Sequence, residues 1–122
     1  METALAQSLV DSVESEFSLH VKLLRRLRHE ADEGEARRHP SARFWGRLLP
    51  ESVADIWQEM KVAERERRQI LRRIAEGSGA WRLSNVVAEM PYEQSERLLE
   101  LRRYFAVVTT EIVTELRTRE AA

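Results

Sequence analysis

The sequence predicts an all-α fold, an antiparallel bundle of three long helices with short helical turns in the two connectors. Three long segments lack glycine and proline and repeat apolar residues at steps of three and four, which is the spacing of one helical face. Glycine and proline gather between these segments, where helices end. Because the segments are similar in length and their connectors are compact, an up-down-up arrangement is favoured.

Length and composition limit what the chain can be. The 122 residues are expected to form one domain, residues 1–122. The net charge of -1 gives no overall field that would attract nucleic acid or an anionic membrane. The absence of cysteine excludes disulfides, thiolate metal sites and a cysteine nucleophile. The first residues, METALAQSLVDSVESEF, lack the basic region of a secretory signal, and no apolar run approaches the roughly 18 residues of a membrane span, so we expect a cytoplasmic protein without membrane insertion.

The first helix is expected over residues 3–31. Its apolar residues alternate steps of three and four without a break, as in a coiled-coil seam. The seam consists of Val10, Val13, Phe17, His20, Leu24, Leu27 and Ala31, and it is widened by Leu5, Leu9, Val21 and Leu23. We interpret His20 as a seam histidine with a hydrogen-bond partner. Gly34 is the predicted stop.

Residues 32–50 are predicted to be a connector that includes a short helical turn. Pro40 breaks the chain, and Ser41 is placed to cap a turn that ends at Leu49. The segment 37–49 mixes aromatic and arginine residues, a composition that suits either stacking on nucleic-acid bases or docking of the aromatics on the core. We favour docking on the core with the arginines in solvent, and the role of this segment stays open.

The second helix is expected over residues 51–76, with Arg67 at the centre of its apolar stripe. The stripe consists of Val53, Ile56, Met60, Ala63, Ile70 and Ile74, with Trp57 and Leu71 beside it. The arginine either packs its stem while its guanidinium reaches water or an acid of a neighbouring helix, or serves as a charged hook for a client.

A second connector, residues 80–91, separates this helix from the last one. Glycines in the segment Glu76–Gly79 end the second helix. A single helical turn is expected over residues 85–90, before Pro91 stops it.

The third helix, expected over residues 92–120, carries more apolar surface than one contact needs. One face repeats Leu98, Leu101, Phe105, Val108, Ile112 and Leu116, and a second row follows at seven-residue steps, Leu99, Ala106 and Val113. Tyr104 lies on the opposite border. The combined arc is wider than the roughly 100° that a surface helix needs, which indicates a further partner. That partner is a fourth helix, a second copy of the chain or a client protein.

No motif points to catalysis or to a cofactor. The sequence lacks GxSxG, P-loop, GxGxxG and HExxH patterns. Glu16 and His20, four residues apart, supply half of a metal site, but the later helices carry no histidine for the other half. Other carboxylates fall on polar faces at four-residue steps from arginine. Such pairs are Glu64 with Arg68 and Glu93 with Arg97. We therefore expect no enzyme activity, no metal, no cofactor and no small-molecule substrate.

Binding to DNA is also disfavoured. Residues 44–60 have about the length of a helix-turn-helix, whose second helix enters the major groove and is rich in arginine, asparagine, glutamine or serine. The second helix in this region begins PESVADIWQEM, which is acidic. We therefore expect no nucleic-acid partner.

The order of the helical segments carries a family resemblance. A first helix with SLVDSVESEFSLHVKLLRRLRHEADEG precedes a middle helix with KVAERERRQILRRIAEG. A short LSNVVAEMP segment and a last helix with RLLELRRYFAVVTTEIVTELR follow. Over residues 5–117 this order resembles the flagellar export chaperones of the FlgN type. The resemblance implies a cytoplasmic chaperone that binds hook-filament junction proteins before export, through its C-terminal region.

In this chain the implied client surface falls on the third helix. The implied partner-binding residues are Leu99, Arg102, Arg103, Tyr104, Ala106 and Val113. An amphipathic helix of the client would lie along the apolar row, with the tyrosine near the rim and the two arginines adding charge complementarity. The alternative is a homodimer, a self-associating structural or regulatory protein without a client, in which the same surface pairs with its own copy around a two-fold axis.

Overall fold

The computed structural model describes residues 1–36, 53–78 and 83–121, and every regular element in these ranges is an α-helix. In chain order the helices are α1 (Thr3–Ala36), α3 (Val53–Ser78), α4 (Leu83–Glu89) and α5 (Tyr92–Ala121). The predicted all-α class is therefore confirmed. The predicted helical turn over residues 41–49 lies outside the described residues, as do the aromatic and arginine side chains around it.

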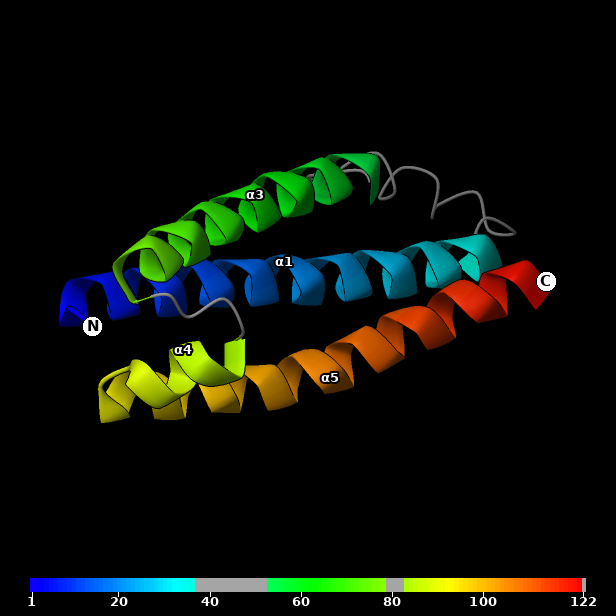
Figure 1. Ribbon diagram of the computed structural model, residues 1–122. Coiled ribbons are helices and arrows are strands. Elements are labelled where there is room, and N and C mark those ends of the chain that lie inside the picture. The colour runs from blue at the N-terminus through cyan, green and yellow to red at the C-terminus, as the bar shows by residue number, and fades with distance from the viewer. Residues whose placement is uncertain (37–52, 79–82, 122) are drawn as a thin grey trace.

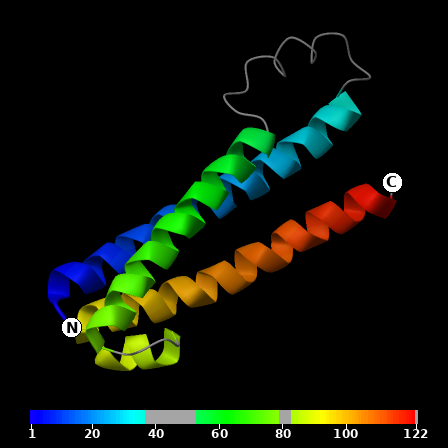
Figure 2. The same ribbon diagram turned by 45° about the horizontal axis from the view of Figure 1, so that its top comes forward.

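The other two long helices both pack on α1. α3 runs back along α1, and α5 runs along it in the same direction as α1 (Figure 1). The short α4 contacts the start of α5. α3 and α5 diverge from each other and share no extended contact, which the turned view makes plain (Figure 2). The extended contacts of α5 are with α1 and α4, so its flank toward α3 is left open.

Two apolar clusters hold the helices together. The first cluster joins the N-terminal half of α1 to the end of α3, to α4 and to the start of α5, through Ala6, Leu9, Val10, Ile74, Val86, Met90, Leu98 and Leu101. The second cluster lies further along α1 and consists of Leu23, Leu24, Leu27, Ile56, Val108 and Ile112. Phe17 packs against both clusters. Most of these residues belong to the predicted stripes, because the spacing of three and four places them on one face of each helix.

One position next to the core does not follow the prediction. Leu116 was expected to continue the buried stripe of α5, but 44% of it is exposed. At this end of α5 the residues that reach α1 are Glu115, which pairs with Arg28, and Arg119, whose Nη2 donates to the Leu27 carbonyl at 3.4 Å. Leu116 follows Glu115 by one residue, so it is rotated about 100° around the helix from Glu115.

The helix ends differ from the predicted ones by a few residues. α1 passes Gly34 and continues to Ala36, and α3 includes Gly77. A glycine inside a helix costs only about 1 kcal/mol relative to alanine, so helix-forming neighbours carry the helix through it. Beside Gly77 a Cβ would meet nothing within 4 Å, so no close approach requires glycine there. The single turn expected over 85–90 is α4, which begins two residues earlier and ends before Pro91.

Candidate partner-binding groove

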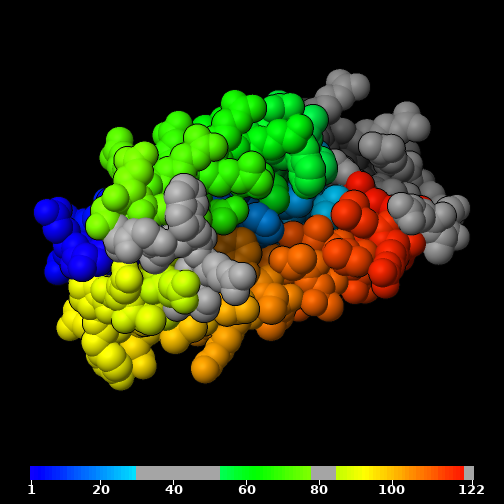
Figure 3. Space-filling model, viewed as in Figure 1, coloured from blue at the N-terminus to red at the C-terminus, as the bar shows by residue number. Residues whose placement is uncertain are grey.

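A groove opens between α3 and α5, with α1 as its floor. A hollow of about 560 Å³ lies there, and it adjoins a second hollow of about 310 Å³, between α1 and α3, with which it shares Glu16, His20 and Arg67. Atoms of α1 (blue) are visible at the bottom of the depression between α3 (green) and α5 (orange) (Figure 3). The larger hollow is also lined by Val87, Leu98, Leu99, Arg102 and Phe105, and the smaller one by Trp57, Met60, Lys61 and Glu64. We call the two hollows together the groove.

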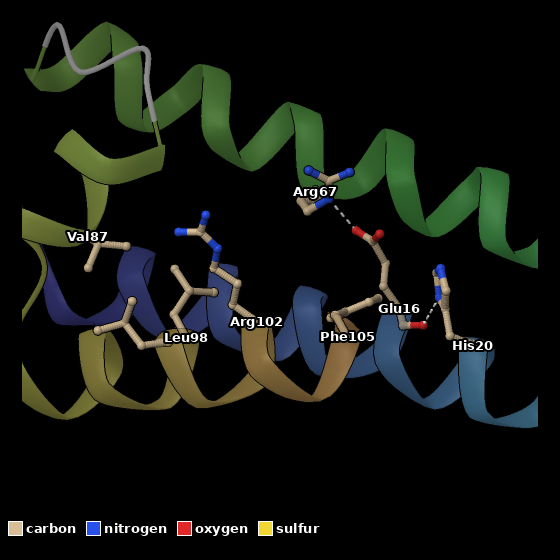
Figure 4. Close-up of a pocket in the computed structure, with 8 residues that line it drawn as sticks. Glu16, His20, Arg67, Val87, Leu98, Arg102 and Phe105 are labelled. Atoms are coloured by element: carbon tan, nitrogen blue, oxygen red, sulfur yellow. Dashed lines mark hydrogen bonds and ion pairs between the residues drawn. The ribbon is translucent and has the colours of Figure 1, made fainter. Parts of the chain in front are cut away.

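An ion pair joins the floor of the groove to one of its walls. Arg67 Nε on α3 donates to Glu16 Oε1 on α1 at 2.6 Å (Figure 4). Only 9% of the Glu16 side chain is exposed, compared with 33% of the Arg67 side chain. Of the alternatives predicted for the Arg67 guanidinium, the pair with an acid of a neighbouring helix is the one observed. Because Glu16 is nearly buried, its charge depends on this one arginine.

His20 sits beside this ion pair and is held on both of its sides. Its Nδ1 donates to the backbone carbonyl of Glu16 at 2.7 Å, which confirms the predicted hydrogen-bond partner. The ring packs edge-on against Phe105, with 4.8 Å between the centroids and 76° between the planes. Phe105 in turn meets Phe17 of α1 with 5.5 Å between the ring centroids, so aromatic contacts join the α5 wall to α1 beneath the groove.

The α5 wall contains part of the predicted partner-binding set. Leu99 and Arg102 line the groove, and the Arg102 side chain extends from α5 toward α3 (Figure 4). Ala106 and Val113 are exposed and lie on the same side of α5, seven and fourteen residues after Leu99. The predicted apolar row is therefore accessible along the open flank of α5, with Leu99 41% and Val113 39% exposed.

Tyr104 and Arg103 do not line the groove. Five residues after Leu99, Tyr104 is rotated about 140° around the helix. Its hydroxyl donates to Glu100 Oε1 at 3.0 Å, and its ring lies 6.0 Å from Phe17. The hydrogen bond raises the pKa of the Tyr104 hydroxyl, and the same bond, followed by Arg97, lowers the pKa of the Glu100 carboxyl. The sequence pattern placed Tyr104 on the border of the apolar arc, and it did not show that this border lies away from the flank that faces α3.

Polar contacts fasten the other side of α5 to α1. Arg97 Nε donates to Glu14 Oε1 at 2.7 Å, and Arg97 Nη1 lies 3.3 Å from Glu100 Oε2. The predicted pair of Glu93 with Arg97 is wrong, because a carboxylate of α1 takes the guanidinium. Gln94 Nε2 also donates to an α1 side chain, Gln7 Oε1, at 3.1 Å. These bonds fix which face of α5 is turned away from α1.

The matching prediction on α3 is correct. Arg68 Nη2 donates to Glu64 Oε1 at 2.7 Å within the helix, four residues apart. Glu64 lines the smaller hollow, and the pair with Arg68 compensates its charge there. The i,i+4 spacing predicted this pair because both side chains stay on one exposed face of the helix.

Of the described residues that line the groove, only Leu99 and Arg102 belong to the predicted partner-binding set. Trp57 and Lys61 lie on the α3 wall, and Val87 of α4 closes one end. The only signal for Trp57 was its place beside the stripe of the second helix, and 51% of it is exposed. No sequence signal marks the distance between α3 and α5, because it depends on how each helix crosses α1.

Within the described ranges, no three or more histidine, aspartate or glutamate side chains gather as a metal site would require. No described helix combines the length and the apolar content needed to cross a membrane. Comparison of the chain with protein-family models, with curated proteins and with solved structures found no significant match. The groove is therefore the structural feature that bears on function.

Proposed function

We propose that the protein captures an amphipathic helix of a client protein in the groove, where the client helix takes the place of a fourth helix. The architecture behind this proposal is an antiparallel bundle of three long helices that is open between α3 and α5. The observation that supports it best is the pair of exposed apolar walls, Trp57 on α3 and Leu99 on α5, above a floor formed by α1.

The groove suits the helix-in-groove mode of recognition. In that mode a helix inserts apolar residues spaced three, four and seven apart between the walls of its receptor. Leu99, Ala106 and Val113 repeat at the same spacing along the open flank of α5, so the contact extends beyond the two hollows. Covering a half-exposed leucine or tryptophan contributes on the order of 1–2 kcal/mol, and such aromatic anchors often dominate helix capture.

The resemblance to the FlgN type of chaperone gives the proposal a specific client. We propose that the client is a hook-filament junction protein, held in the cytoplasm before export so that its amphipathic segment does not aggregate. The other candidate occupant is a second copy of the chain, which would make the protein a self-associating helical dimer. The two occupants predict different masses in solution.

A peptide titration with matched variants tests the proposal. Fluorescein-labelled peptides corresponding to the amphipathic terminal helices of the organism's junction proteins would be titrated with wild type, Leu99→Gln and Val107→Gln. Val107 is the control because it is apolar, lies on α5, is 58% exposed and does not line the groove. We expect Leu99→Gln to raise Kd about tenfold, which corresponds to about 1.4 kcal/mol, and Val107→Gln to leave it unchanged.

Three outcomes would contradict parts of the proposal. If no peptide binds, helix capture from junction proteins is wrong. If both variants weaken binding equally, the groove is not the site. If sedimentation shows a wild-type dimer that Leu99→Gln converts to a monomer, the occupant of the groove is a second copy and not a client.

A further inference from the structure

Two cations face the groove without a carboxylate partner. Lys61 on α3 and Arg102 on α5 are exposed and line opposite walls. Neither side chain has an ion pair or a hydrogen bond with any residue that the structure describes. The acids that line the groove are already compensated, Glu16 by Arg67 and Glu64 by Arg68. The groove therefore carries two surplus positive charges in a chain whose net charge is -1.

The surplus charges flank apolar side chains. Arg102 lies beside Leu99 and Phe105 in the larger hollow, and Lys61 lies beside Trp57 in the smaller one. A helix seated on these apolar groups would place the residues at the edges of its own apolar face next to the two cations. In bundles of helices these edge residues, the e and g positions of a heptad, select the partner by charge.

We propose that the captured helix is acidic, with carboxylates on both edges of its apolar face that pair with Arg102 and Lys61. This inference rests on the proposed function and specifies the chemistry of its client. An occupant with lysine at the same edges would meet like charges on both walls, and like-charge contacts discriminate against a partner. A neutral helix would bind through the apolar walls alone.

The positions of the two cations also set a register. Arg102 and Arg67 line the larger hollow together, and Lys61 precedes Arg67 by six residues (67 - 61), which is about 9 Å of helix. We therefore expect the carboxylate that pairs with Arg102 and the carboxylate that pairs with Lys61 to lie about two turns apart along the client helix. Acids confined to one edge or one turn would reach only one of the cations.

Three designed peptides of identical apolar sequence test the charge preference. Each has about three heptads with leucine at a and d, and carries glutamate, glutamine or lysine at e and g. Kd would be measured by fluorescence anisotropy at low salt and at about 0.15 M salt, where the Debye length is about 8 Å. We expect the glutamate peptide to bind wild type most tightly, the lysine peptide most weakly, and the gap to shrink as salt rises.

Charge reversal on the protein assigns the effect to the two named cations. Arg102→Glu and Lys61→Glu are each expected to weaken the glutamate peptide about three- to tenfold and to strengthen the lysine peptide. Arg73→Glu and Arg65→Glu are the matched controls, because they make the same change in net charge at exposed sites outside the groove. The controls are expected to leave the order of the three peptides unchanged.

The outcomes separate this inference from the proposed function. Equal, Leu99-dependent binding of all three peptides would retain helix capture and refute the acidic client. A preference for glutamate that the control reversals remove as well would also refute it, because net charge would then explain the effect. Failure of every peptide to bind would contradict helix capture itself.

Discussion

The ion pair between Arg67 and Glu16 allows a quantitative test of the groove's floor. In Arg67→Met the arginine stem is replaced by an apolar chain of similar length, and the Glu16 carboxylate is left nearly buried without its cation. Removing one partner of a fully buried pair costs roughly 3–5 kcal/mol. Because a third of the Arg67 side chain is exposed to the groove, water relieves part of this cost, and we expect a loss of about 2–3 kcal/mol.

The assay is urea unfolding followed by far-ultraviolet circular dichroism at neutral pH. With an m value of about 1–3 kcal/mol/M, the expected loss lowers the urea midpoint by roughly 1–2 M. The double variant Glu16→Leu with Arg67→Met removes both charges and places apolar groups between the two clusters. It is expected to recover most of the loss, since apolar replacement of buried ion pairs is often neutral or stabilising.

Two results would refute this reasoning. A single variant Arg67→Met as stable as wild type would show that Glu16 is adequately solvated and that the floor of the groove is wetter than its exposure indicates. A double variant no more stable than Arg67→Met would show that the loss comes from packing of the arginine stem and not from the abandoned charge.

Two further predictions concern α5. Ile112→Glu, at a site 8% exposed, is expected to lower the free energy of unfolding by more than about 4 kcal/mol and to unfold the protein. Val113→Glu, one residue further and 39% exposed, is expected to shift the thermal midpoint by only a few degrees and to weaken client binding. Equal loss of helicity in both variants would overturn the assignment of faces. Tyr104→Phe should raise the Glu100 pKa toward its ordinary value of 4.5, as followed by carboxyl NMR shifts. Because the folded-state pKa of Glu100 is lowered, its small contribution to stability is present above about pH 4.5 and is lost as the pH falls through the lowered pKa, so an unchanged titration in the variant would show that the hydroxyl does not hold the carboxylate.

The sequence predicted the helices well because each is long and its apolar residues keep one period. Leu24, Ile56 and Leu101 were all expected inside and are all buried. Helix ends were predicted less well, since glycine permits a stop without requiring one. Gly34 shows this, because α1 continues through it to Ala36.

Contacts between helices were the part that periodicity could not supply. The partner of Arg67 is 51 residues away in the chain, and its identity depends on how α3 crosses α1. Arg97 had an acid at the favoured spacing within its own helix, yet it binds Glu14 of α1. The surplus apolar arc of the third helix predicted exposed apolar residues on α5, and Leu99 is one of them. The groove that Leu99 lines exists because α3 and α5 diverge, and periodicity did not predict that divergence.

The central place of α1 has a consequence for how the protein is made. α1 is synthesised before α3 and α5, yet the first cluster needs residues as late as Leu101 and the second needs Ile112. Until those residues have left the ribosome, the apolar flanks of α1 have no complete set of partners within the chain. The helices form locally and quickly, but their assembly must wait for contacts across most of the sequence, so the nascent chain is most exposed to aggregation just before α5 is complete.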